Sequence, residues 1–188
     1  MKLNVIKFKS VKSTNDEAIK LIKSKNIYSG IVVSEKQIKG KGTMGKKWVS
    51  ETGNLFISIF FQVDLEKFKI KDFLLLNVNS IKKILTEYSR KPITIKFPND
   101  LLIDGRKLCG ILQEIIVYKD DKYLITGIGI NSIKATVNTK FKATSLKNNS
   151  DKKIYNHFIL KDIIKYYEEV IIDLKTSNLN FIKNKYIN

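Results

Sequence analysis

The chain has 188 residues, a formal net charge of +17 and 43% hydrophobic residues, which predicts a single folded domain and excludes a disordered chain. No apolar stretch approaches the ~20 residues that span a bilayer, and the N-terminal sequence lacks the apolar core of a secretory signal. The single cysteine, Cys109, excludes an internal disulfide framework and a cysteine-based zinc site, so we expect a cytoplasmic protein.

The N-terminal third of the sequence predicts one helix and two strands. Residues 13–25 form an amphipathic run, and Thr14 and Glu17 have the spacing of a capping box at a helix start. Residues 30–34 and 55–62 are short and almost continuously apolar, which favours buried strands.

The remaining sequence predicts hairpins between two further helices. In chain order, the predicted elements are a helix over 71–90 that Pro92 ends, a strand over 93–97, a hairpin of 107–118 with 122–130, and a helix over 155–176. Asp104-Gly105 and residues 119–122 carry turn signals. We expect Leu74 and Leu75 on the apolar face of the first helix and Phe158 on that of the second. This order predicts an α+β fold with a mixed, largely antiparallel sheet flanked by helices.

The loop between the first two predicted strands has an unusual composition. From Lys36 to Lys47 it contains five lysines, three glycines and no acidic residue, which favours an anion such as phosphate as its ligand. Residues 40–46 match the G-x-x-x-x-G-K consensus of a P-loop. However, Lys47 stands where that motif needs Ser or Thr, and a predicted strand follows where it needs a helix. Both differences exclude a P-loop.

Taken with six other motifs, the loop resembles that of the biotin protein ligase family, whose consensus is G-R-G-R-R-G-R-x-W. Gly40, Gly42, Gly45 and Trp48 align with this consensus. The other matches, in order, are Ser13-Thr14-Asn15, Gln37, Lys96-Phe97-Pro98-Asn99-Asp100 for K-W-P-N-D, Lys107 to Leu112, Gly127 to Asn131, and Ala143 to Leu146. The ordered set spans residues 13–146, which makes the resemblance specific.

The resemblance implies a biotin–[acetyl-CoA-carboxylase] ligase in the short form that lacks the N-terminal DNA-binding domain. Such enzymes use ATP and Mg²⁺ to convert biotin to biotinyl-5′-AMP, and then transfer biotin to one lysine of a carboxylase carrier domain. Residues 1–188 would form one catalytic domain, mainly helical over 150–188, with the family's C-terminal β-barrel absent or vestigial. We therefore expect biotin, ATP and a carrier domain as partners, no DNA, no membrane, no prosthetic group, and a homodimer, which is common in the family.

The resemblance also assigns roles to single residues. Lys96 is the expected catalytic residue, because a compact positive charge at a strand end can balance carboxylate and phosphate oxygens. The residues expected to bind biotin are Ser13, Thr14, Asn15, Gln37, Lys41, Gly42, Thr43 and Lys96. The residues expected to bind the nucleotide are Gly40, Lys41, Gly45, Trp48 and Asn131. Asp100 is the expected Mg²⁺ contact.

The loop departs from the family consensus in its charges. Lys41 and Lys46 replace arginines, and Thr43 and Met44 replace two more. Lysine keeps the charge but loses the bidentate fork of arginine, and the other two residues lose both. We therefore expect this loop to hold the adenylate less tightly.

Two other functions remain as alternatives. The first is a lipoate or octanoate transferase on the same fold, some of which use an acyl-thioester cysteine. Cys109 lies within a predicted strand without a base nearby in sequence, so we expect it to be a core residue and not a nucleophile. We expect His157, the only histidine, to lie on the surface or to be a hydrogen-bonded core residue. The second is a basic nucleic-acid-binding module, although only Arg90 and Arg106 among 35 basic residues are arginines.

Overall fold

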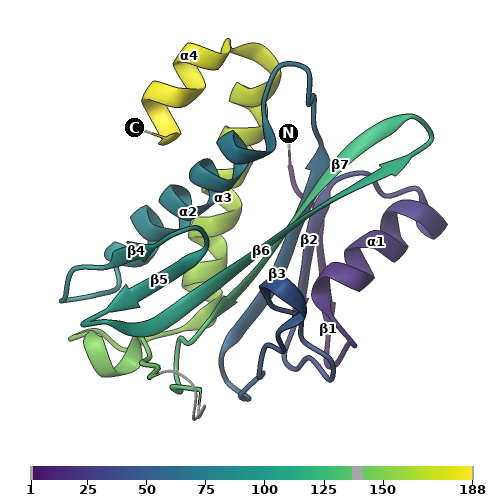
Figure 1. Cartoon of the computed structure of the whole chain (residues 1–188). Coiled ribbons are helices and arrows are strands. Elements are labelled where there is room, and N and C mark those ends of the chain that lie inside the picture. Colours follow the sequence, from purple (N-terminus) through teal and green to yellow (C-terminus); the bar gives the residue numbers. More distant parts are fainter. Residues whose placement is uncertain (1, 137–141, 188) are drawn as a thin grey trace.

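A seven-stranded sheet runs through the molecule in the computed structural model, which describes residues 2–136 and 142–187 (Figure 1). Its strands are β1 (Val5–Phe8), β2 (Gly30–Ser34), β3 (Leu55–Gln62), β4 (Thr94–Lys96), β5 (Asp100–Ile103), β6 (Arg106–Tyr118) and β7 (Asp121–Ile130). The helices are α1 (Thr14–Lys25), α2 (Ile70–Thr86), α3 (Asn156–Thr176) and α4 (Leu179–Ile182), with 3₁₀ turns at Thr43–Gly45 and Lys147–Asn149 and a π-helical segment at Lys183–Ile187. Within the described ranges, no helix is long and apolar enough to cross a membrane.

The sheet is mixed, with the strand order β1-β2-β3-β7-β6-β5-β4. β1 and β2 are parallel, and the other five neighbouring pairs are antiparallel. The predicted mixed, largely antiparallel sheet flanked by helices is therefore confirmed. The sequence did not predict β1, because its four residues alternate between exposed and half-buried at the edge of the sheet and carry a weak apolar signal.

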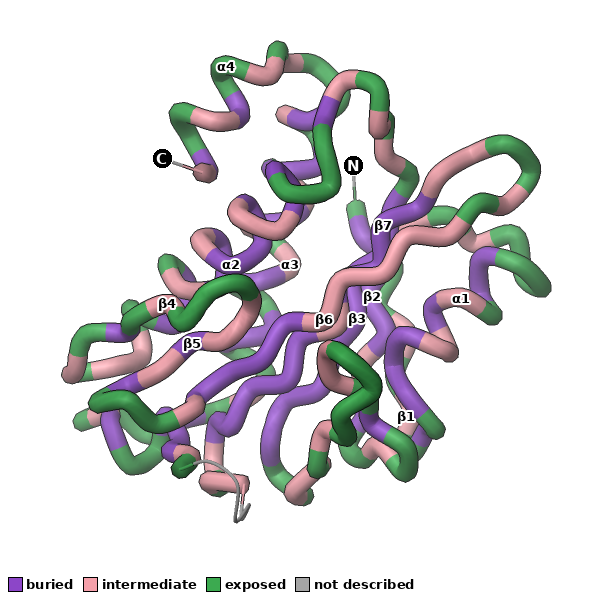
Figure 2. The backbone as a smooth tube through the Cα atoms, viewed as in Figure 1, coloured by how far each residue is buried: buried purple, intermediate pink, exposed green. Residues whose placement is uncertain are grey.

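Helices cover both faces of the sheet, with α1 on the face opposite α2 and α3 (Figure 1). The larger core packs Leu76 of α2 and Ile163 of α3 with Ile57 of β3. The smaller core packs Ile22 of α1 with Phe60 of β3. Because successive strand residues point to opposite faces, β3 supplies both cores. β2, β3 and β7 are buried along most of their length (Figure 2).

Two tight turns connect the long hairpins. Asp104 and Gly105 join β5 to β6 with φ angles of 50° and 71°, and Lys119 and Asp120 join β6 to β7 with φ angles of 50° and 65°. Two successive positive φ values are typical of the type I′ turn of a two-residue hairpin. Both predicted hairpin turns are confirmed, and the second is shorter than predicted because Asp121 already belongs to β7.

The predicted helices form, but parts of their predicted apolar faces were wrong. α2 ends at Thr86, earlier than predicted, and Leu74 and Leu75 are only half-buried. The buried face of α2 instead includes the polar Asn77, whose amide bonds across to β6 and β7. On α3, Phe158 is 50% exposed. An apolar-periodicity argument cannot place a buried face that carries a hydrogen-bonded polar side chain.

Candidate active site

A cavity of about 220 Å³ lies on the α1 side of the sheet. Its walls are the start of α1, the loop between β2 and β3, and strands β4 to β7. The predicted site residues that line it are Ser13, Thr14, Asn15, Gln37, Lys41, Gly42, Thr43, Trp48, Lys96 and Asp100. Gly40, Gly45 and Asn131 do not line it. The fold thus brings most of the predicted residues, from distant parts of the chain, around one space.

Glycines form the floor of this cavity. β6 and β7 pair Gly110 with Gly129, and Gly127 shares a face with Gly129 because strand residues two apart point the same way. A Cβ atom at Gly127 would lie 2.4 Å from Oδ1 of Asn15, and one at Gly129 would lie 2.4 Å from Cε2 of Trp48. Only glycine therefore lets these two side chains lie so close to the sheet.

The glycine-rich loop folds into a small hairpin, residues 40–48, which we call the strap. The N–H of Trp48 donates to the carbonyl of Gly40 at 2.9 Å, and the N–H of Gly42 donates to that of Lys46 at 2.7 Å. A Cβ at Gly40 would lie 2.5 Å from the carbonyl oxygen of Trp48, and Gly45 has a φ of 71°. The next regular element is β3, so the exclusion of a P-loop is confirmed.

The indole ring of Trp48 lies directly on the glycine floor. Ring atoms of Trp48 are the nearest neighbours of a Cβ built at Gly110, at 2.6 Å, or at Gly129. Its Nε1 is buried and has no hydrogen-bond partner in the part of the chain that the structure describes. The Lys107 ammonium lies 5.3 Å from the ring centre. The indole therefore offers a flat apolar wall with a cation beside it and one N–H for a ligand acceptor.

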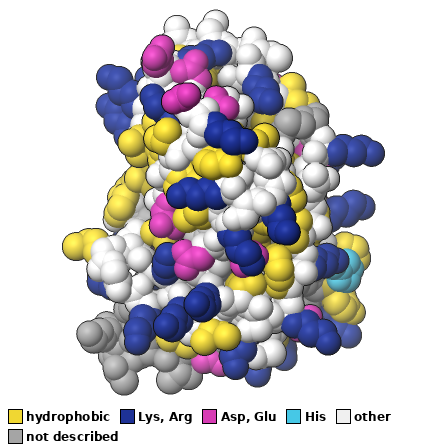
Figure 3. All heavy atoms as spheres, turned by 90° about the vertical axis from the view of Figure 1, so that its right-hand side faces the viewer, with side chains coloured by type: hydrophobic (Ala, Val, Ile, Leu, Met, Phe, Trp, Pro, Cys, Tyr) yellow, Lys and Arg dark blue, Asp and Glu magenta, His cyan; other side chains and the backbone are white. Residues whose placement is uncertain are grey.

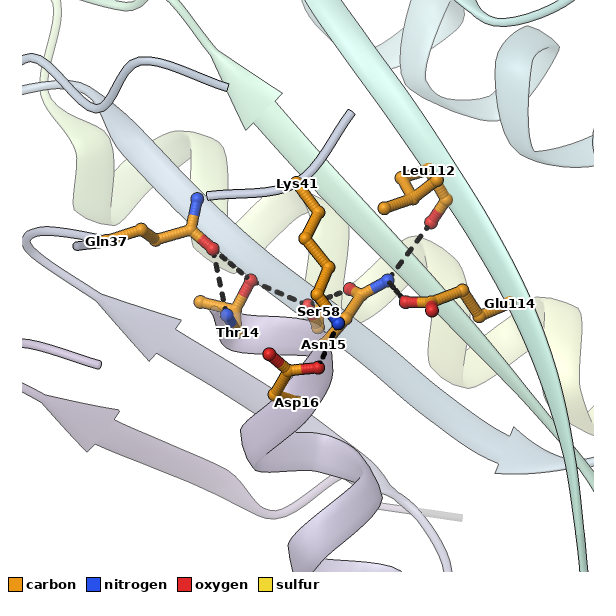
Figure 4. A network of polar contacts seen from close by, with 8 residues as sticks. All are labelled: Thr14, Asn15, Asp16, Gln37, Lys41, Ser58, Leu112 and Glu114. Carbon is orange, nitrogen blue, oxygen red and sulfur yellow. Dashed lines mark hydrogen bonds and ion pairs between the residues drawn. The ribbon is translucent and has the colours of Figure 1, made fainter. Parts of the chain in front are cut away.

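A chain of polar contacts includes Thr14, Asn15 and Gln37, which line the cavity near α1 (Figure 4). The N–H of Thr14 donates to Oε1 of Gln37 at 2.8 Å, and Oγ1 of Thr14 lies 3.0 Å from the same oxygen. Oγ of Ser58 lies 2.7 Å from Oγ1 of Thr14 and 2.5 Å from Oδ1 of Asn15. Nδ2 of Asn15 donates to Glu114 at 2.6 Å. We call these five residues the head network.

The head network also explains why the predicted capping box was wrong. Ser13 is the N-cap residue of α1, and its side chain makes no capping bond. The hydroxyl of Thr14 contacts Gln37 and the sheet instead of an amide of its own helix. Glu17 bonds Lys20 on the helix surface at 3.2 Å. The local pattern predicted that the Thr14 side chain would cap the helix, but this side chain bonds to distant residues instead.

An ion pair ties the strap to α1. The ammonium of Lys41 bonds the carboxylate of Asp16 (Figure 4). This hydrogen bond is the main reason why the pKa of Lys41 is raised; burial opposes it, and attraction by Asp16 and then Glu114 adds to it. The two side chains are 45% and 40% exposed, so the pair contributes little to stability. The pair holds Lys41 of the strap next to Asp16 in the first turn of α1.

Two lysines line the opposite end of the cavity. Nζ of Lys107 lies 2.7 Å from Oδ1 of Asp100, and the Lys107 side chain is only 18% exposed. A Cβ at Gly110 would lie 3.3 Å from this Nζ, so the ammonium lies over the floor. Lys96 is exposed at the end of β4. Sequence reasoning selected Lys96 and gave Lys107 no role, because motif position alone does not reveal which lysine is enclosed.

Three other candidates lie away from the cavity. Asn131 is buried, and its amide donates to the Lys107 carbonyl at 3.3 Å and accepts from Thr136 at 2.9 Å, so it supports the backbone behind Lys107. Cys109 is fully buried, and burial raises the pKa of its thiol, which confirms the expected core residue. His157 is exposed on α3.

The sequence contained signals for the residues that were missed. Ser58 is the one polar residue inside the apolar run LFISIFF, and Glu114 is the one acid of β6, directly before the apolar run Ile115 to Val117. Gly127 and Gly129 have the period-two spacing that puts both on one face. Each signal marks an unusual strand position, but only the fold shows that they meet.

Lysines dominate the charge of the cavity. The lysines that line it are Lys41, Lys46, Lys47, Lys96, Lys107 and Lys142. Elsewhere, lysine and arginine side chains are spread over the face of the molecule in Figure 3 and do not form one stripe. The cavity therefore suits an anionic ligand, whereas the charge on the face in Figure 3 lacks the continuous track typical of a nucleic-acid site.

Comparisons with known proteins agree with this geometry. The sequence model of the biotin/lipoate A/B protein ligase family matches residues 7–131. The bifunctional ligase/repressor BirA of Bacillus spizizenii is 30% identical over 179 residues, 92% of this chain and 55% of that protein. BirA of Bacillus subtilis is 31% identical over 178 residues, 91% of this chain and 54% of that protein. This chain thus spans about half the length of these curated relatives.

A solved structure extends the similarity to the fold. The biotin protein ligase from Aquifex aeolicus, in complex with biotin and ATP, superimposes with a TM-score of 0.77 at 30% identity, over 97% of this chain and 76% of that one. The family match covers most of the elements that build the cavity, from β1 to the end of β7. The chain belongs to the biotin/lipoate A/B protein ligase family.

Proposed function

We propose that this chain activates biotin with ATP and transfers the biotinyl group to a lysine of a carboxylase carrier domain. First, a carboxylate oxygen of biotin attacks the α-phosphorus of ATP, and the bond from that phosphorus to the β-phosphate oxygen breaks, releasing pyrophosphate. Then the neutral amine of the acceptor lysine attacks the acyl carbon of biotinyl-5′-AMP, the acyl–oxygen bond breaks, and AMP and a proton leave. Neither step needs an enzyme nucleophile, so catalysis rests on positioning and charge.

The observation that carries this proposal is the pairing of two different chemistries in one cavity. The end near α1 offers uncharged hydrogen-bonding groups of Thr14, Asn15 and Gln37, which suit the cyclic urea of biotin. The rest of the cavity offers lysine ammonium groups, which suit a carboxylate and phosphates. Similarity to the Aquifex aeolicus enzyme, solved with biotin and ATP, supports the same assignment.

The geometry favours Lys107 over Lys96 as the cation at the reacting centre. Lys107 is enclosed, is paired with Asp100 and lies over the floor, whereas Lys96 is exposed at the end of β4. A preorganised charge in an enclosed site stabilises developing negative charge more than a solvated one. We therefore assign Lys107 to the reacting carboxylate and α-phosphate and keep Lys96 as a second contact to the substrates.

The strap supplies the remaining contacts. We assign Lys41, Gly42 and Thr43, which line the cavity, to biotin, and we assign the ring of Trp48, which lines it too, to adenine. Gly40 and Gly45, expected at the nucleotide, shape the strap, and Asn131 acts on the nucleotide only through the backbone it supports.

The described residues do not form a resident Mg²⁺ site. Asp100 is ion-paired with Lys107, and among residues 2–136 and 142–187 no three His, Cys, Asp or Glu side chains cluster in a way that would hold a metal. In ATP-dependent enzymes Mg²⁺ is held largely by the substrate phosphates. We therefore propose that Mg²⁺ enters with ATP and neutralises phosphate charge, and we derive no step through it.

We place the reaction in the cytoplasm, which supplies ATP and keeps a free thiol such as Cys109 reduced. The proposed partners are biotin, ATP and the carrier domain, without DNA or a membrane, and a second copy of the chain as a dimer partner. Residues 1–188 are proposed to act as one catalytic domain.

Pyrophosphate release tests the proposal. The purified chain is incubated with ATP, Mg²⁺ and either biotin or lipoate, and release is followed without a carrier domain and with one. We expect release with biotin and not with lipoate, and a mass gain of one biotinyl group on the carrier. Release with lipoate alone would assign the chain to the lipoate branch of the family, and release with neither would refute the proposal.

A further inference from the structure

A carboxylate stands at one end of the head network, on the sheet and outside the motifs that point to the site. Glu114 is half-buried on β6, opposite Ile125 of β7. It accepts a hydrogen bond from Nδ2 of Asn15 at 2.6 Å, and the same Nδ2 lies 3.5 Å from the carbonyl oxygen of Leu112 (Figure 4). Both neighbours on this side of the Asn15 amide are acceptors.

These acceptors fix the direction of the hydrogens along the network. A carboxylate and a carbonyl can only accept, so Asn15 turns its NH₂ group toward them and its Oδ1 toward Ser58. Ser58 has one hydroxyl hydrogen and donates it to this Oδ1, 2.5 Å away. The 2.7 Å contact between Ser58 and Thr14 then takes its hydrogen from Thr14.

This order of hydrogens leaves two acceptor oxygens facing each other, and a ligand N–H can donate to both. With its hydrogen turned to Ser58, Oγ1 of Thr14 faces Oε1 of Gln37 at 3.0 Å without a hydrogen between them. Both residues line the cavity. Two acceptor oxygens this close attract a ligand N–H, and a cyclic urea carries two such groups.

We propose that Glu114 is a positioning and specificity residue, whose charge orders the head network so that the cavity presents paired acceptors to a ring N–H of biotin. The inference rests on the proposed function and adds to it a residue that does not touch the ligand. Neutralising Glu114 permits the reverse order, in which Asn15 donates to Ser58, Ser58 to Thr14 and Thr14 to Gln37. In the reversed network the Thr14 hydroxyl hydrogen lies between Thr14 and Gln37, so the cavity no longer presents two free acceptors there.

Glu114→Gln tests this order while keeping the shape of the side chain. We expect the KM for biotin in pyrophosphate release to rise on the order of tenfold, as for one lost hydrogen bond, with the KM for ATP unchanged. An analogue in which oxygen replaces one ring N–H should lose much affinity for the wild type and little for the variant. Glu17→Gln, the same change at a glutamate of α1 that pairs with Lys20 and does not line the cavity, is the matched control and should leave all values unchanged.

A double-mutant cycle separates this role from a merely structural one. If Glu114 acts through Asn15, Glu114→Gln will not raise the KM for biotin further in the Asn15→Ala background. Ser58→Ala breaks the chain without touching Glu114, and it should raise the same KM even if the Glu114 variant fails to fold. The inference is overturned if the KM for biotin is unchanged in both Glu114→Gln and Ser58→Ala. It is also overturned if Glu114→Gln raises this KM by the same factor with Asn15 present and with Asn15→Ala. Absence of biotin-dependent release by the wild type overturns the proposed function instead.

Discussion

Replacement of Gly127 by alanine tests whether the glycine floor exists to accommodate the head network. The added Cβ would lie 2.4 Å from Oδ1, 3.0 Å from Cγ and 3.2 Å from Nδ2 of Asn15, and these are its three nearest neighbours. The backbone of Gly127 does not need a positive φ. The cost of the substitution therefore comes from the displaced Asn15 amide and not from the backbone.

The magnitude follows from the contacts that this amide makes. Its displacement breaks the bond to the Glu114 carboxylate, worth about 1.5–3 kcal/mol, and the bond from Ser58, worth about 0.5–1.5 kcal/mol. Removing a strand glycine returns roughly 0.5–1 kcal/mol. We expect the free energy of unfolding to fall by about 2 kcal/mol, which corresponds to about 4–8 °C in Tm for a chain of this size.

Thermal and urea unfolding of four proteins measure this effect: the wild type, Gly127→Ala, Asn15→Ala and the double variant. In the Asn15→Ala background the clashing atoms are gone, so Gly127→Ala should be neutral or slightly stabilising there. Biotin binding by calorimetry should weaken in Gly127→Ala. An equal loss of stability in both backgrounds would refute the reasoning, because the cost would not then pass through Asn15.

Three further predictions concern the lysines, the thiol and the strap. Lys107→Met should lower kcat for pyrophosphate release on the order of 100-fold and Lys96→Met by less than about tenfold; the opposite ranking would contradict the assignment. Because burial raises the pKa of Cys109 above the ~8.5 of an unfolded thiol, the free energy of unfolding should fall above that pH by an extra ~1.4 kcal/mol per pH unit relative to Cys109→Ala; parallel pH profiles would count against it. Labelling of a bystander protein in the presence of biotin and ATP should decrease when Thr43 and Met44 are both replaced by arginine, and purely carrier-limited labelling by the wild type would disprove a leaky strap.

Local sequence signals predicted the parts of the fold that depend on local chemistry. Asp104-Gly105 specifies a tight turn through its backbone preferences, and the apolar runs of β2 and β3 need no partner to be recognised. The sequence did not predict β1, because a short edge strand buries little of its surface and so has a weak apolar pattern. The buried face of α2 was misplaced because Asn77 is buried only by virtue of its cross-sheet partners.

The candidate site shows the same division. Motif spacing was sufficient to select Thr14, Gln37 and Trp48, which the fold gathers at one cavity. It was not sufficient to separate Lys107 from Lys96, because enclosure depends on how the strap and β6 approach each other. Glu114 was missed because the hydrogen bond that its carboxylate accepts comes from Asn15, a helix residue far away in sequence.

A crystal structure of the chain with biotin and ATP bears most directly on the claim that one cavity carries both substrates. We expect biotinyl-5′-AMP along the glycine floor, with its ring urea at Thr14 and Gln37, its acyl phosphate beside Lys107 and its adenine against Trp48. A ligand bound elsewhere, or biotin and nucleotide in separate sites, would contradict the account.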